Sequence, residues 1–172
     1  MFQFEYLWLY KYIAMRKLTI EFKWAILFTI AMLLWMLFEK TMGWHGERIA
    51  DHWWLTLFFA PFAILMYLLA MREKRRRVYG GKMTWLQGFV SGLILSVFVA
   101  LLSPLAQYIT HNYITPEYFN NVIEHSVTNE LMTRTAANEY FNINNYMWQS
   151  AFGALGMGVV TSAVVALFVK KK

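Results

Sequence analysis

The chain alternates long apolar blocks with short polar connections. The apolar blocks cover about residues 22–42, 53–71, 83–109 and 146–169, and the last three contain no charged side chain. A helix needs roughly 20 apolar residues to cross the hydrocarbon core of a bilayer. The pattern therefore predicts an all-α integral membrane protein with four transmembrane helices. Pro61 lies inside the second block, where we expect a kink.

Composition supports this assignment. Hydrophobic residues make up 59% of the 172 residues and charged residues only 15%, against about 45–50% and about 25% in soluble domains. The chain has no cysteine, which excludes disulfides and thiolate metal sites. No cofactor is expected.

The basic residues predict how the chain is threaded. Thirteen of the sixteen Lys and Arg residues lie before or at the start of the first span, between the second and third spans, or after the fourth. The other connections carry seven of the ten acidic residues. By the positive-inside bias, both termini should be cytoplasmic in a bacterial inner membrane.

A basic cluster between the second and third spans is the strongest of these charge signals. We interpret it as a topology determinant that also attracts anionic lipid. The connection is too short for a nucleic-acid-binding module. The cluster consists of Arg72, Lys74, Arg75, Arg76, Arg77 and Lys82.

Small residues recur every four positions in the last two spans. Such faces let membrane helices approach closely. They predict either a tight hairpin of spans three and four or a homo-oligomer in which another copy covers one face. The faces consist of Gly88, Gly92, Ser96 and Ala100 in span three, and Ser150, Ala154, Gly158, Ser162 and Ala166 in span four.

The segment between spans three and four should contain an amphipathic helix on the outer side. Thr115-Pro116-Glu117 has the features of a helix start, with Thr115 as the N-cap residue. The apolar residues that follow recur at helical spacing: Phe119, Val122, Ile123, Val127 and Leu131. This helix can lie on the membrane surface or bind a partner.

The connection between spans one and two is rich in possible metal ligands. Histidine and carboxylate groups bind zinc, but the spacing in GWHGERIADHWW matches no HExxH motif. We therefore expect no metal centre. The residues that would form one are His45, Glu47, Asp51 and His52, with Glu39 just before them.

Residues 1–14 stand apart from the single membrane domain expected over residues 15–172. Their aromatic residues can form an interfacial segment, or translation starts at Met15 and these residues are a gene-model extension. The pattern leaves both alternatives open.

Four stretches carry a family resemblance: WMLFEKTMGWHGERIADH, REKRRRVYGGKMTWLQGFVSGLILS, TPEYF and GVVTSAVVALFVKKK. Over roughly residues 15–172 the chain resembles the small Bacteroidota membrane proteins grouped as domain of unknown function 4199. That resemblance implies four inner-membrane helices and supplies no catalytic residues.

No ionisable side chain is expected deep in any span, so we predict no catalytic residues. The expected function is that of a non-enzymatic accessory or scaffold subunit, which contacts a protein partner or another copy through the small-residue faces. The alternative is a small oligomeric transporter or channel lined by Ser and Gln. A membrane enzyme that uses the outer His and acid residues ranks third.

Overall fold

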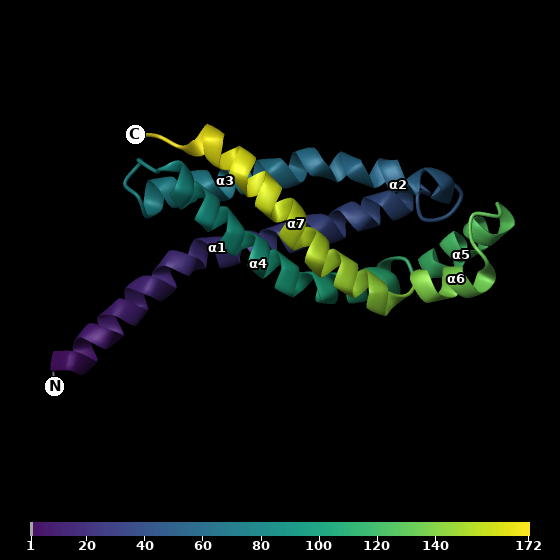
Figure 1. Ribbon diagram of the computed structural model, residues 1–172, viewed down its shortest axis with the longest axis horizontal. Helices are drawn as coiled ribbons and strands as arrows, with labels where there is room; N and C mark the ends of the chain where they lie inside the picture. The colour runs from purple at the N-terminus through teal and green to yellow at the C-terminus, as the bar shows by residue number, and fades with distance from the viewer. Residues whose placement is uncertain (1) are drawn as a thin grey trace.

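The computed structural model describes residues 2–172, with side chains described from Leu18 onward (Figure 1). It is built from helices, and within the described residues it contains no β-strand, only an isolated backbone bridge between Met83 and Lys171. The elements are α1 (Phe2–Thr41), η1 (Ile49–Asp51), α2 (His52–Leu55), η2 (Thr56–Phe59), α3 (Ala60–Arg77), α4 (Trp85–Ile109), η3 (Thr110–Ile114), α5 (Tyr118–Thr128), α6 (Arg134–Tyr140) and α7 (Ile143–Val169).

Four stretches of the described chain are long and apolar enough to cross a membrane: Leu18–Thr41, Ile49–Arg77, Trp85–Ile114 and Ile143–Val169. Each overlaps a predicted span. The second and fourth stretches contain theirs whole, whereas the first ends at Thr41 and the third begins at Trp85, one and two residues inside the predicted bounds. Large apolar side chains remain exposed on all four, such as Leu101 at 71% and Phe168 at 76%. Apolar surface of this extent is stable only against lipid or another protein. Together with four helical stretches long enough to cross a bilayer, these faces indicate a membrane protein.

The four long helices form one bundle with two distinct ends (Figure 1). The C-terminus and the α3–α4 turn lie at one end, which we call the basic end because it carries the predicted basic cluster. The connection after α1 and the short helices α5 and α6 lie at the other, the α5–α6 end. The choice between Met1 and Met15 as the start concerns side chains outside the described part.

Pro61 marks a change of helix type within the second span. The span starts as η1, α2 and the 3-10 turn η2, and a regular α-helix begins only at Ala60, with Pro61 in its first turn. Proline is tolerated there because the first N–H groups of a helix have no intrahelical partner. The 3-10 turn therefore lies before the proline, and the kink expected at Pro61 stays a prediction.

α4 and α7 pack along their small-residue faces. A Cβ atom added to Gly92 would lie under 3.0 Å from the Ser162 side chain, and one added to Gly158 would come as close to Ser96. Gly88 similarly faces Ala166. The two faces therefore cover each other within one chain, and Val99, Val165 and Val169 continue the core beside them. Of the two packing alternatives, the structure contains the hairpin.

The basic end contains a buried ion pair that the sequence interpretation missed. Lys74 of α3 lies 2.7 Å from the carboxylate of Glu21 of α1, and Ser91 of α4 donates a hydrogen bond of 2.6 Å to the same carboxylate. All three side chains are buried. The assignment of Lys74 to the lipid-attracting cluster is therefore wrong, because this side chain joins three helices.

Arg75 also forms a hydrogen bond within the fold. Its guanidinium donates a 2.6 Å hydrogen bond to the carbonyl of Val169, at the end of α7. Carbonyls in the last turn of a helix have no intrahelical donor, so Arg75 satisfies one of them. Arg72, Arg76, Arg77 and Lys82 remain exposed.

A helix occupies the predicted segment between spans three and four, but its boundaries differ. α5 begins at Tyr118 with Glu117 in the N-cap position, so Thr115 is not its cap. It ends at Thr128, which leaves Leu131 outside the helix and 66% exposed. A second helix, α6, follows with Thr133 as its side-chain cap. The prediction did not include α6.

Candidate metal centre at the α5–α6 end

The last turn of α1 holds a carboxylate with no solvent exposure. Glu39 is 0% exposed, and its Oε1 accepts a 2.5 Å hydrogen bond from Trp35 Nε1. Its Oε2 lies 2.9 Å from His45 Nε2 and 3.1 Å from His52 Nε2. A buried carboxylate is stable only when it is paired or hydrogen-bonded, and these three side chains meet that need.

The connection after α1 folds back and brings both histidines to Glu39. Gly43 adopts a left-handed conformation with φ +73°, which ends the helix and reverses the chain. The Trp44 N–H then donates to the carbonyl of Glu39. His45 lies directly after this reversal, and His52 is the first residue of α2.

Tyr118 of α5 links this cluster to the short helices. Its hydroxyl lies 3.3 Å from His52 Nδ1 and 3.3 Å from the hydroxyl of Tyr146. Its ring meets those of His45 and His52 at centroid distances of 5.4 and 5.3 Å. Burial raises the pKa of Tyr118 far above its ordinary value, so this phenol stays protonated and can donate a hydrogen bond.

His111 belongs to the surrounding aromatic layer and is not part of the group formed by Glu39, His45 and His52. Its ring stacks on Phe119 at 4.3 Å, and its Nε2 lies 3.0 Å from Gln107 Oε1. Its Nδ1 and that of His45 are buried without a hydrogen-bond partner among the described residues. The other nitrogen of each ring is engaged, so these imidazoles have fixed orientations.

The ligand atoms of Glu39, His45 and His52 all lie within 4.8 Å of one another. In a tetrahedral zinc centre with bonds of about 2.1 Å, neighbouring ligand atoms lie about 3.4 Å apart. The two N···O distances are slightly shorter than that edge. The third pair, between the two histidines, lies within 4.8 Å. Two histidines with one glutamate form a known zinc ligand set.

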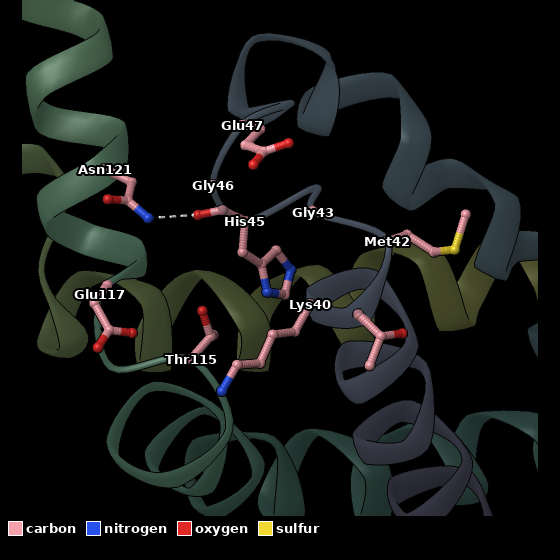
Figure 2. Close-up of a pocket in the computed structure, with 10 residues that line it drawn as sticks. Lys40, Met42, Gly43, His45, Gly46, Glu47, Thr115, Glu117 and Asn121 are labelled. Atoms are coloured by element: carbon pink, nitrogen blue, oxygen red, sulfur yellow. Dashed lines mark hydrogen bonds between the residues drawn. The ribbon is translucent and has the colours of Figure 1, made fainter.

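A pocket of about 410 Å³ reaches this cluster at His45 (Figure 2). Figure 2 shows Asn121 of α5 facing the loop, where its amide donates a 2.8 Å hydrogen bond to the His45 carbonyl. Lys40, Glu47 and Glu117 also line the pocket. A solvated ion therefore has a polar approach to His45.

From the sequence we expected no metal centre, and the structure brings together a different group of side chains from the one named there as a possible centre. This group includes His45 and His52 but replaces Glu47 and Asp51 with Glu39. Glu47 lines the pocket, whereas Asp51 accepts a hydrogen bond from Trp54 and lies 4.0 Å from Arg48. In the sequence, Glu39 was placed just before the four candidate residues and was not counted among them. An acidic residue in the last helical turn, followed closely by two histidines, was the available signal.

The comparison with protein families gives one match. The model of the family described as "Protein of unknown function (DUF4199)" matches residues 23–171, so the chain belongs to this family. Glu39, His45 and His52 lie inside the matched region. No curated protein and no solved structure matches the chain.

Proposed function

Taking membership of this family as the premise, we propose that the chain is a non-enzymatic accessory protein of the bacterial cytoplasmic membrane that binds Zn²⁺ through Glu39, His45 and His52. The observation that carries the proposal is the convergence of these three ligand atoms at one buried point. Three protein ligands leave a fourth position on a tetrahedral ion. Water or a group from a partner would occupy it.

Electrostatics supports a cation at this point. With both imidazoles in the neutral form that binds metals, the cluster carries the single negative charge of Glu39. A buried charge without a counter-charge lowers the stability of the fold, and a divalent ion would supply that counter-charge. Metal binding would replace the two N–H···O hydrogen bonds to Glu39 with stronger coordination bonds.

We infer the accessory role from the helices and loops that a bound ion would connect. The ligands come from the end of α1, the following loop and the start of α2, and Tyr118 joins His52 to α5. Metal binding would therefore stabilise the position of α5 and α6 over the bundle. The faces of α4 and α7 are used within the chain, so we propose the α5–α6 end as the partner surface.

The proposed orientation places that surface outside the cytoplasm. The basic end carries Arg72, Arg76, Arg77 and Lys82 together with Lys170–Lys172, and the positive-inside bias puts such an end in the cytoplasm. The zinc ligands would then face the periplasm, where the pocket at His45 opens to solvent.

Metal analysis of the purified protein tests the zinc site. After exchange into zinc-containing buffer and removal of free ion, we expect one zinc per chain by mass spectrometry. The variants E39Q, H45N and H52N should lose it, whereas H125N and D51N should keep it. Retained size in detergent and helical circular dichroism would show that the variants fold. Zinc-free wild-type protein, or equal loss in both groups, would contradict the proposal.

The alternative function, an oligomeric transporter or channel lined by Ser and Gln, has less support. Ser96 and Ser103 of α4 are buried and donate hydrogen bonds to carbonyls of their own helix, at Gly92 and Val99. Ser91 donates to Glu21. These hydroxyls are already hydrogen-bonded within α4 or to α1, and a solute path would have to break those bonds.

A further inference from the structure

A second pocket lies at the basic end, between α1 and α3. It has a volume of about 300 Å³ and is lined by Trp24, Leu69, Arg72, Glu73, Arg76 and Arg77. Its residues from α3 recur at helical spacing, so they share one face of that helix. Leu69 lies toward the membrane-spanning part, and the arginines lie at the helix end. The pocket is therefore apolar on one side and cationic on the other.

Glu73, the acidic residue in this pocket, is already neutralised by neighbours. Its Oε2 accepts hydrogen bonds from Lys23 Nζ at 2.5 Å and Trp24 Nε1 at 2.7 Å, and its Oε1 lies 3.1 Å from Arg77 Nε. Glu73 thereby fixes α1 to α3 and orients the indole of Trp24. The negative charge of Glu73 is thus paired with Lys23 and Arg77, and it does not neutralise the other two arginines of the pocket, Arg72 and Arg76.

Arg72 and Arg76 lie one helical turn apart and are both exposed. Among residues 18–172, neither takes part in an ion pair or a side-chain hydrogen bond with another residue. Their neighbours Lys74 and Arg75, by contrast, are engaged inside the fold. The pocket therefore presents two guanidinium groups that have no protein acceptor, next to an oriented tryptophan.

We propose that this pocket binds the headgroup of an anionic phospholipid. Guanidinium groups bind phosphate through paired hydrogen bonds, and Arg72 and Arg76 supply two such groups at the end of a spanning helix, where headgroups lie. Trp24 is a residue type typical of this interfacial depth, and Leu69 continues the pocket toward the acyl chains. This site is independent of the proposed zinc centre.

Lipid titration by native mass spectrometry tests the site. Detergent-purified protein is titrated with phosphatidylglycerol or phosphatidylcholine, and the double variant R72Q/R76Q is compared with K82Q/K172Q. The control removes two exposed charges at the same end but outside the pocket. We expect wild-type protein to prefer phosphatidylglycerol and R72Q/R76Q to bind it about 100-fold more weakly, because each substitution removes a charge-assisted hydrogen bond to the phosphate. The control should change far less.

Three outcomes would overturn the proposal. Equal weakening in both double variants would mean that the lipid responds only to the summed charge of this end. Equal affinity for the two lipids would mean that the phosphate and charge of the headgroup are not recognised. Displacement of phosphatidylglycerol by millimolar inorganic phosphate would identify a site for a free anion.

Discussion

The hydroxyl of Tyr118 on α5 and the Nδ1 atom of His52 on α2 lie 3.3 Å apart. In the metal-free form, His52 Nε2–H donates to Glu39, so Nδ1 accepts from Tyr118. Metal on Nε2 would move the proton to Nδ1, and the direction of this hydrogen bond would reverse. The Tyr118 hydroxyl would then be free to donate to Tyr146. This pair therefore connects the candidate metal centre with α5.

Replacement of Tyr118 by phenylalanine should weaken zinc binding without removing a ligand. Groups that hydrogen-bond to ligating histidines typically contribute 10–100-fold, so we expect a loss of about tenfold or more in affinity. Competition with a chromophoric chelator measures it. Y113F is the control, because Tyr113 is 71% exposed. Equal affinities of Y118F and Y113F would show that the Tyr118 hydroxyl does not support the site.

Substitution of Gly158 by leucine should destabilise the bundle. Even a Cβ atom at this position would lie under 3.0 Å from Ser96, whereas one at Gly153 of the same helix meets nothing within 4 Å. Overpacking costs about 1–3 kcal/mol per site, so G158L should unfold at lower denaturant than G153L. Unfolding in mixed micelles, followed by circular dichroism, compares the two. Identical midpoints would contradict the packing of α4 on α7.

Removal of Lys74 alone should cost more stability than removal of the whole buried pair. K74M leaves the carboxylate of Glu21 buried without its cation, and breaking such a pair costs about 3–5 kcal/mol. The double variant K74M/E21Q keeps a hydrogen-bond acceptor for Ser91 and should recover much of that loss. The same micelle unfolding assay on wild type, K74M, E21Q and the double variant gives the coupling energy. If the two substitutions simply added, Lys74 and Glu21 would not interact in the folded protein.

Glu124 of α5 should titrate below its ordinary range. The guanidinium of Arg134 forms two hydrogen bonds with this carboxylate, at 2.5 and 2.9 Å, and lowers the pKa of Glu124. Because the folded pKa lies below the unfolded one, the contact contributes fully above the unfolded pKa. That contribution is lost as pH falls through the folded pKa. NMR titration of the Glu124 carboxyl carbon measures this, and R134Q should return the pKa to its ordinary value.

Reporter fusions test the proposed orientation. Green fluorescent protein joined after Lys172 should fluoresce, and alkaline phosphatase joined after Asn129 should be active, because the first folds in the cytoplasm and the second requires the periplasm. The opposite pair of results would reverse the topology. The zinc site would then face the cytoplasm.

The spans and their packing partners could be read from the sequence because lipid imposes simple requirements. A crossing helix needs an uninterrupted apolar stretch, and close helix contact needs small residues at regular spacing. Both signals are local, which is why Gly92 and Gly158 could be identified without coordinates. The positions of basic residues along the chain likewise predict its orientation in the membrane. They do not show which of these side chains are buried inside the fold. Lys74 illustrates this limit.

The sequence by itself determined the four apolar helices, the small-residue faces of α4 and α7, and the gathering of histidines and acids at one end. Only the tertiary structure decided which of these polar residues meet. Glu39 joins His45 and His52 because Gly43 reverses the chain, and Lys74 joins Glu21 because α1 and α3 are in contact there. A buried charge must find its partner in space, and that partner can lie 53 residues away in the chain.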